Sequence, residues 1–307
     1  MVNNVSFSVT NRCNSHCTMC NIWKEKSFYG EMSVAEIEKL FSHQCFAQVD
    51  TISLTGGEPF LRNDLIDIIQ VLKGCMPKLQ RLFLNTNATC PDVINRICVY
   101  AAKMFEQVIL SVSIEGTKET HNKLRGIDNY DCVIDVLGRM AHIPNLNLSL
   151  SMTLSRENAN MQNLQHVYDI AHKNNAMFNF RLADKSSTYY KNMNMDLSVP
   201  VKQKQEVSRF IATHCGDNEF LMCLKQFIDT GHLDLLMQNG ENKCLAGKTF
   251  VFVHPNGVIS PCLYSTQQIT PEQLLTGQSI VVGEQEPCPC CTDCAIYPML
   301  EARKRTR

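Results

Sequence analysis

Three cysteines near the N-terminus, Cys13, Cys17 and Cys20, have types and spacing that could do chemistry. They follow a short apolar run, Val5 to Val9, so all three thiols are expected on one loop after a strand. Cys thiolates ligate iron–sulfur clusters, and three on one loop can hold three irons of a [4Fe–4S] cube. Since no fourth cysteine lies in the loop, the fourth iron would be open to a small molecule.

The same loop could instead hold zinc. Structural zinc sites close a tetrahedron with Cys or His ligands. His16 could complete a site of three cysteines and one histidine. With sixteen cysteines in the chain, a chance grouping is a further explanation. Motifs elsewhere in the sequence must therefore decide between these interpretations.

Composition is that of a soluble globular protein, with 44% hydrophobic and 19% charged residues. The 307 residues suffice for one large α/β domain, or for a domain with an appendage. No apolar run reaches the length of about eighteen residues typical of a membrane span. The net charge of −1 argues against general nucleic-acid binding.

The N-terminal sequence lacks the basic region and cleavage site of a signal peptide. Cysteines at metal-type spacings fit a reducing compartment better than a disulfide framework. We therefore expect a cytoplasmic protein. The scattered cysteines are expected to act as small buried hydrophobic residues.

Short β-type runs alternate with helical patterns through about residue 181, which is typical of βα units and a parallel sheet. The predicted strands cover residues 5–10, 51–55, 81–85, 107–113, 146–153 and 177–182. Predicted helices cover about 33–43, 63–73, 91–103, a stretch reaching 141, and 161–174. Ser33 and Glu36 form a capping box at the first helix. The pattern predicts an α/β fold, a partial (β/α)6 TIM-like barrel, with its chemistry in loops at the carboxyl ends of the strands.

Polar motifs stand at these predicted strand ends. In Gly56-Gly57-Glu58-Pro59 the glycines let the backbone approach a ligand closely, and Glu58 can accept a hydrogen bond from an ammonium group. Taken alone, the segment also fits an ordinary turn. At or after the ends of the next two predicted strands stand Thr86, Asn87, Ser113, Glu115 and Arg125.

The ordered motifs resemble those of the radical S-adenosylmethionine (radical SAM) superfamily: CxxxCxxC, GGEP, TNA in place of TNG, and SxEG in place of SxDG. The resemblance implies that the open iron chelates the amino and carboxylate groups of SAM. The reduced cluster would then cleave SAM to methionine and a 5′-deoxyadenosyl radical, which removes a hydrogen atom from the substrate. The protein supplies ligands, orientation and shielding.

The resemblance also implies a role for each motif. The GGEP segment would hold the methionine amino group, and the TNA segment would lie under SAM. Glu115 stands where family members often have Asp near the ribose or methionine, and its longer side chain must fold back to reach the ribose. Arg125 either pairs with the SAM carboxylate or is a structural arginine in a surface loop. The implied SAM-binding set is Gly56, Gly57, Glu58, Pro59, Thr86, Asn87, Ser113, Glu115 and Arg125.

Cysteines reappear towards the C-terminus, around a predicted hairpin at 249–261 whose Asn256-Gly257 turn is a strong hairpin signal. Cys244 before it and Cys262 after it resemble the opening of the SPASM domain and of the shorter twitch domain, which implies an auxiliary [4Fe–4S] cluster. Too few residues remain for the two auxiliary clusters of a full SPASM domain, so a twitch domain fits better. The implied ligands are Cys244, Cys262, Cys291 and Cys294, with Cys288 or Cys290 as alternatives. A zinc ribbon with four cysteines is the competing interpretation.

Three parts are therefore expected: a barrel at 1–185, a helical connector at 186–243 with helices near 201–213 and 219–238, and the auxiliary-cluster domain at 244–307. Arg181 and Asp184 lie at the expected barrel mouth. They could position a substrate or form a salt bridge that braces the strand end.

The resemblance implies an oxidoreductase with two [4Fe–4S] clusters, SAM, and an electron donor of the flavodoxin or ferredoxin type. An auxiliary cluster with four Cys ligands has no open iron, so its expected role is to take an electron from the substrate radical. Twitch-containing dehydrogenases of aminocyclitols and peptide-modifying SPASM enzymes are both similar. Because the sequence starts directly at the first strand, a small molecule or carbohydrate is favoured over a peptide. A redox-neutral epimerase, mutase or lyase and a non-catalytic zinc protein stay open.

Overall fold

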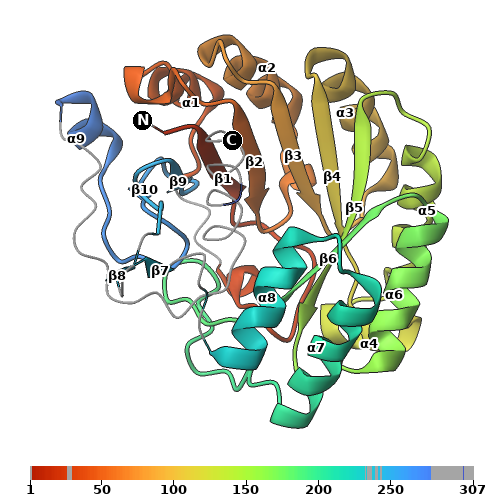
Figure 1. Ribbon diagram of the computed structural model, residues 1–307. Helices are drawn as coiled ribbons and strands as arrows, with labels where there is room; N and C mark the ends of the chain where they lie inside the picture. The colour runs from red at the N-terminus through yellow and green to blue at the C-terminus, as the bar shows by residue number, and fades with distance from the viewer. Residues whose placement is uncertain are drawn as a thin grey trace.

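The computed structural model describes residues 2–25, 30–231, 233, 237–238, 241–242, 244–277 and 300. Six parallel strands lie side by side in chain order, as Figure 1 shows. They are β1 (Asn4–Thr10), β2 (Thr51–Gly56), β3 (Arg81–Thr86), β4 (Gln107–Ser113), β5 (Leu146–Leu154) and β6 (Met177–Leu182). The predicted α/β fold with a partial barrel is confirmed.

Helices cover the outer face of this sheet (Figure 1). They are α1 (Val34–Phe41), α2 (Leu65–Cys75), α3 (Pro91–Met104), α5 (Tyr130–Met140) and α6 (Met161–Lys173). The short helix α4 (Lys118–Arg125) lies instead at the end of the strands, against the loop that carries the three cysteines. The Ser33–Glu36 capping box begins α1 as predicted. The single helical stretch expected up to residue 141 is two helices, because Gly126 adopts a left-handed conformation (φ 65°) that ends α4.

The strands alternate between an apolar outer face and a polar inner face, as the period of two in a strand requires. Outward residues such as Leu54, Leu84 and Leu110 are fully buried under the helices. Small polar side chains, including Ser53, Asn85 and Ser111, point inward and line a cavity of about 650 Å³. A TIM barrel usually fills this space with bulky branched side chains, so the polar interior leaves room for a ligand.

The chain after β6 adds two helices, α7 (Val201–His214) and α8 (Glu219–Thr230). The helix expected to reach about residue 238 ends earlier, because Gly231 takes a left-handed conformation (φ 79°). Shorter elements are β7 (Met237–Gln238), β8 (Glu241–Asn242), α9 (Pro271–Leu275) and the 3₁₀ helices η1 (Ile22–Lys24), η2 (Gln44–Phe46) and η3 (Pro59–Leu61). No helix among the described residues is both long and apolar enough to cross a membrane.

The predicted C-terminal hairpin is present as β9 (Phe250–Val253) and β10 (Ile259–Ser260), which pair antiparallel. Strand β9 also pairs in parallel with β1, so the sheet has eight strands in the order β10-β9-β1-β2-β3-β4-β5-β6. The hairpin of the expected auxiliary-cluster domain therefore continues the barrel sheet. The three-part division itself stays a prediction.

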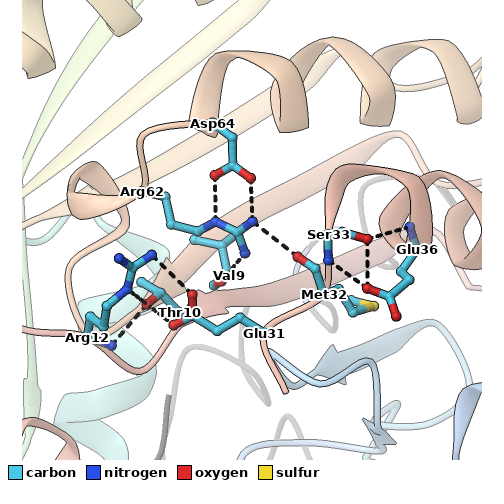
Figure 2. A network of polar contacts seen from close by, with 9 residues as sticks. All are labelled: Val9, Thr10, Arg12, Glu31, Met32, Ser33, Glu36, Arg62 and Asp64. Carbon is cyan, nitrogen blue, oxygen red and sulfur yellow. Dashed lines mark hydrogen bonds and ion pairs between the residues drawn. The ribbon is translucent and has the colours of Figure 1, made fainter. Parts of the chain in front are cut away.

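A buried arginine joins the first two βα units, as Figure 2 shows. The Arg62 guanidinium, only 5% exposed, donates to the carbonyls of Val9 (2.9 Å) and Met32 (3.1 Å) and pairs with both oxygens of Asp64. It thus fixes the end of β1, the segment before α1 and the start of α2. The cysteine loop begins directly after this junction.

Candidate active site

The cysteine loop lies at one end of the cavity and is anchored on two sides. The backbone N–H groups of His16 and Thr18 donate to the carbonyls of Arg125 and Leu124 at the end of α4, both at 2.9 Å. These are terminal carbonyls that a helix cannot satisfy itself. Among the residues that line the cavity are all three cysteines, Cys13, Cys17 and Cys20.

On its other side the loop rests against the end of β2. Gly57 and Glu58 donate backbone hydrogen bonds to the carbonyls of Thr10 (2.8 Å) and Arg12 (2.7 Å). A Cβ on Gly56 would lie 2.1 Å from the Thr10 oxygen, and one on Gly57 would lie 2.1 Å from the Arg12 oxygen. The sequence predicted that these glycines let the backbone approach a ligand; in the structure they let it approach the cysteine loop.

The three thiols suit a cluster in their chemistry. Burial raises the pKa of Cys13 to about 11 and that of Cys20 to about 12, and it also raises the pKa of Cys17. Each thiol is close enough to another for its charge to oppose ionisation. Such thiols release their protons to solvent when a metal binds, because its positive charge stabilises the thiolates. The donor set therefore fits three irons of a [4Fe–4S] cluster.

The residues of this loop fit a zinc site less well than they fit a cluster. His16 is exposed and its ring lies edge-on to Trp23, with 4.8 Å between the centroids. Among the described residues, no group of three or more His, Cys, Asp or Glu is placed to hold a metal ion. A cube needs only one thiolate for each iron, so this finding concerns a single ion and not a cluster.

Glu58 lies on the cavity wall, and the residue is only 1% exposed. It accepts hydrogen bonds from the Asn87 backbone N–H (2.6 Å) and the Thr86 hydroxyl (2.9 Å), both at the end of β3. Burial raises the pKa of Glu58 to about 7 despite these donors. A ligand cation would favour the ionised form. Pro59 begins η3 and is buried.

The end of β3 also contacts the cysteine loop. The Asn87 side-chain amide donates to Asn14 (2.8 Å) and to the Ser15 hydroxyl (2.9 Å). Ala88, which replaces the glycine of the TNG pattern, adopts a left-handed conformation with φ 63°. This conformation favours glycine, which gives a physical reason for the family pattern.

Arg125 is not in a surface loop. Its side chain is 12% exposed, lines the cavity and pairs with Glu115 at 3.3 Å. Its Nε is buried and has no hydrogen-bond partner among the described residues. A buried guanidinium N–H without a partner calls for one, and the carboxylate of a bound amino acid would supply it.

Glu115 does not face the cavity as Ser113 does. One of its oxygens accepts from Arg125 and the other from the Thr153 backbone N–H at 2.8 Å. The carboxylate is thus engaged behind the arginine. Its ribose contact, which the resemblance implied, stays a prediction that this arrangement does not favour.

Two buried residues, His121 and Asn129, connect both halves of the site. His121 Nδ1 accepts from the Glu115 backbone N–H (3.1 Å), so its Nε2 is left to donate to the Asn129 oxygen (3.0 Å). The Asn129 amide then donates to the Asn87 carbonyl at 2.6 Å. Burial lowers the pKa of His121 to about 4, which keeps the ring neutral. Their burial could not be read from the sequence.

Arg181 and Asp184 both line the cavity at its mouth. The Arg181 guanidinium lies 5.2 Å from the centre of the Tyr190 ring. Burial raises the pKa of Asp184, and the charge of Arg181 opposes that shift. Their roles in substrate binding or in bracing the strand end stay predictions.

The segment after Asp184 also lines the cavity, through Tyr189 and Tyr190. The Tyr189 hydroxyl donates to the Gly56 carbonyl (3.0 Å), and the Asn192 amide donates to the Met19 carbonyl (2.8 Å). Ser186 bonds the Leu263 carbonyl at 2.8 Å. The segment thus joins the end of β2, the cysteine loop and the residue after Cys262.

Of the predicted auxiliary-cluster ligands, Cys244 and Cys262 are buried on either side of the β9–β10 hairpin. Burial raises the pKa of Cys244, and the nearby Cys262 adds to the effect. Cys288, Cys290, Cys291 and Cys294 lie outside the described residues. The auxiliary cluster therefore stays a prediction.

Fold and site together define a partial barrel whose cavity is lined by three loop cysteines, Glu58 and Arg125. The chain belongs to the Radical SAM superfamily, whose family model matches residues 7–165. Membership of this family implies a [4Fe–4S] cluster and SAM as cofactors.

The similarity to individual relatives is low, at 23% and 26% identity in the two examples that follow. A "Probable GTP 3′,8-cyclase" of Methanothermobacter thermautotrophicus is 23% identical over 270 residues, which cover 85% of this chain and 84% of the relative. One from Saccharolobus islandicus is 26% identical over 158 residues, and the match spans about half of either chain, 49% of this one and 47% of the relative.

Solved structures share the fold. Streptococcus suis SuiB bound to S-adenosylmethionine matches with a TM-score of 0.69 and 13% identity, over 94% of this chain and 66% of SuiB. Native anSMEcpe with bound AdoMet matches with a TM-score of 0.63 and 17% identity, over 86% of this chain and 75% of that chain. At these identities the matches concern the fold alone.

Proposed function

We propose that this protein reductively cleaves SAM at a cluster held by Cys13, Cys17 and Cys20, and removes a hydrogen atom from a substrate inside the barrel. The observation that carries the proposal is the unpartnered Nε of Arg125 in the cavity that also holds Glu58 and the three thiols. When bound, the cluster and SAM supply an electron and a 5′-deoxyadenosyl radical.

The chain's own residues would hold the two ends of the methionine moiety. Glu58 would accept hydrogen bonds from the ammonium group, and Arg125 would donate to the carboxylate. Charge-assisted hydrogen bonds of this kind are the strong ones. Gly56, Gly57, Thr86, Asn87 and Ser113 would shape the rest of the SAM site.

For the net reaction we propose oxidation: an auxiliary [4Fe–4S] cluster would accept one electron from the substrate radical, and one proton would pass to water. Cys244 and Cys262 would supply two ligands, and Cys291 and Cys294 the others. A flavodoxin or ferredoxin would reduce the first cluster. The buried cysteine pair around the hairpin supports this proposal.

A second candidate is nucleotide cyclisation. It is favoured by one observation, the relative named as a GTP 3′,8-cyclase that aligns over 85% of this chain. Incubation of the reduced enzyme with GTP and SAM separates the candidates: a cyclised nucleotide would support the second, and unchanged GTP would oppose it.

The test of the shared chemistry uses anaerobically reconstituted protein, iron and acid-labile sulfide analysis, and 5′-deoxyadenosine formation after reduction. Two clusters predict about eight irons per chain. A Cys13→Ala/Cys17→Ala/Cys20→Ala variant should lose about half the iron and all SAM cleavage. A matched Cys45→Ala/Cys132→Ala/Cys223→Ala variant should keep both. Zinc without sulfide, or cleavage by the first variant, would refute the proposal.

A second variant tests the auxiliary cluster. Cys291→Ala/Cys294→Ala should contain about four irons per chain and still form 5′-deoxyadenosine, but little oxidised product. Circular dichroism and SAM binding establish that it folds, because metal binding is coupled to folding in such domains. Oxidised product at the wild-type rate from a folded variant without the second cluster would make that cluster structural.

A further inference from the structure

The cavity extends below the proposed SAM site, along the inner faces of β4, β5 and β6. The strand register sets Ser111 beside Ser149, and Ser113 beside Ser151. It also sets Ser151 beside Asn179 of β6. These residues all line the cavity. We name Ser111, Ser149 and Ser151 the hydroxyl wall.

The hydroxyl groups of this wall have donor and acceptor positions that no hydrogen bond within the described residues occupies. The side chains of Ser111 and Ser151 have no hydrogen-bond partner among the described residues, and both are partly accessible. Ser149 accepts one hydrogen bond, from the Asn179 amide at 3.4 Å. Each hydroxyl can donate one hydrogen bond and accept two, so the wall presents both kinds of group to the cavity.

Asn179 is held in place from outside the barrel. The amide of Asn218, which caps α8, donates to the Asn179 oxygen at 3.0 Å and to the Phe178 carbonyl at 3.2 Å. Asn218 is itself fixed, because it accepts from the Leu221 backbone N–H at 3.1 Å. The Asn179 oxygen is thus engaged, and its NH₂ group is directed towards the wall.

Charge is concentrated away from the hydroxyl wall. Arg125 and Glu58 lie with the cysteines at one end, Arg181 and Asp184 lie at the mouth, and Arg81 pairs with Asp50 at the opposite end of the strands. The middle of the cavity is uncharged, and its lining combines these hydroxyls with apolar side chains such as Phe83 and Ile109. An apolar group there would displace water from the hydroxyls without replacing its hydrogen bonds, which is costly.

The spacing of the hydroxyls suits a ring with several of them. Neighbouring strands are about 5 Å apart, and alternate residues of one strand are about 7 Å apart. Ser111, Ser149 and Ser151 therefore form a corner with sides of roughly these lengths. A sugar or cyclitol ring carries donors and acceptors over a similar area.

We propose that the hydroxyl wall and Asn179 bind a polyhydroxylated ring of the substrate, either a free sugar or cyclitol or the ribose of a nucleoside. This inference rests on the proposed function, since it places that ring where a radical formed from SAM could reach it. It names the substrate class, and it assigns residues that the SAM site does not use.

The test measures equilibrium binding to the cluster-loaded, unreduced protein with SAM present, by saturation-transfer NMR titration. Two matched probe pairs are used: myo-inositol against cyclohexanol, and guanosine against guanine. The first pair reports a cyclitol, and the second reports a ribose. A blocked Gly-Ser-Gly peptide represents a peptide substrate. The polyhydroxylated member of at least one pair should bind at least tenfold more tightly than its match and than the peptide.

Variants tie the binding to the wall. Ser111→Ala/Ser151→Ala should weaken binding of that probe about tenfold, since each neutral hydrogen bond contributes a few-fold. SAM affinity should not change. Ser42→Ala, at an exposed position just after α1, is the matched control and should behave as wild type.

Failure of this inference is distinguishable from failure of the proposed function. If SAM is cleaved but neither polyhydroxylated probe binds better than its match, or if the peptide binds best, the substrate class is wrong. The same holds if the double variant keeps wild-type probe affinity. If SAM is not cleaved at all, the proposed function fails first.

Discussion

Arg125 and Glu115 form an ion pair inside the protein, with 3.3 Å between Nη1 and Oε1 and side chains 12% and 1% exposed. The carboxylate holds the guanidinium at the cavity wall, and the Nε remains without a partner among the described residues. Glu115 therefore acts on SAM through Arg125, as a positioning residue, in our proposal. This arrangement leads directly to the first prediction.

Arg125→Gln should weaken SAM binding by about 10–150-fold, because a charge-assisted hydrogen bond of about 1.5–3 kcal/mol is lost. It should also destabilise the protein, since Glu115 keeps a buried charge without its partner. Arg125→Gln/Glu115→Gln should regain stability in urea titrations but not SAM affinity. Equal stability of the single and double variants would show that the pair is not coupled.

Glu58→Gln should lower SAM affinity by a similar factor, and it should remove a pH dependence. The pKa of Glu58 is raised to about 7 by burial, so its carboxyl is protonated below that pH and attracts the ammonium group poorly. Wild-type SAM affinity should therefore rise as pH increases from about 6 to about 8. Calorimetry at several pH values should show a flat profile for Glu58→Gln, and a wild-type profile for the exposed control Glu38→Gln.

Asn129→Ala should disturb the part of the SAM site that holds the methionine moiety, although Asn129 itself does not line the cavity. Asn129 holds the Asn87 carbonyl and, through His121, the Glu115 backbone. We expect about a tenfold loss of SAM affinity, equivalent to about 1.4 kcal/mol. Binding of 5′-methylthioadenosine, which lacks the amino and carboxylate groups, should be unchanged. An equal loss for both ligands would indicate a general structural defect.

Gly57→Ala should prevent formation of the first cluster. Its Cβ would lie 2.1 Å from the Arg12 carbonyl oxygen, so the cysteine loop would have to move. Iron content should fall by about four per chain. Gly74→Ala, in α2 with open space around the new methyl group, should keep all iron and gain up to about 1 kcal/mol of stability. Full iron content in Gly57→Ala would overturn this reading of the GGEP motif.

Arg62→Met should lower the free energy of unfolding by about 3 kcal/mol, because a buried arginine with three partner elements is lost. Arg139→Met is the matched control: it removes exposed ion pairs with Asp92 and Asp135, which contribute little. Urea unfolding of the cluster-free proteins measures both. A similar change in the two variants would mean that the Arg62 junction does not stabilise the barrel.

The sequence by itself determined the order of strands and helices, because a half-buried strand and an amphipathic helix each leave a distinct period in the chain. It also determined the Ser33 capping box and the Asn256-Gly257 hairpin, since both depend on neighbouring residues only. The three cysteines and Glu58 could be predicted as a site because their motifs stand at strand ends, which meet at one edge of a parallel sheet.

The tertiary structure decided those features of the site that depend on contacts between segments far apart in the sequence. Whether Arg125 lies in a surface loop or on the cavity wall depends on how α4 packs against the cysteine loop. The His121–Asn129 connection and the Arg62 junction join residues from separate units, and no local pattern marks them. Strand β9 pairs with β1 across most of the chain, and such pairing is set by the completed sheet. The open, hydroxyl-lined interior likewise exists only once six strands have curved round it, which brings serines from different strands into one cavity.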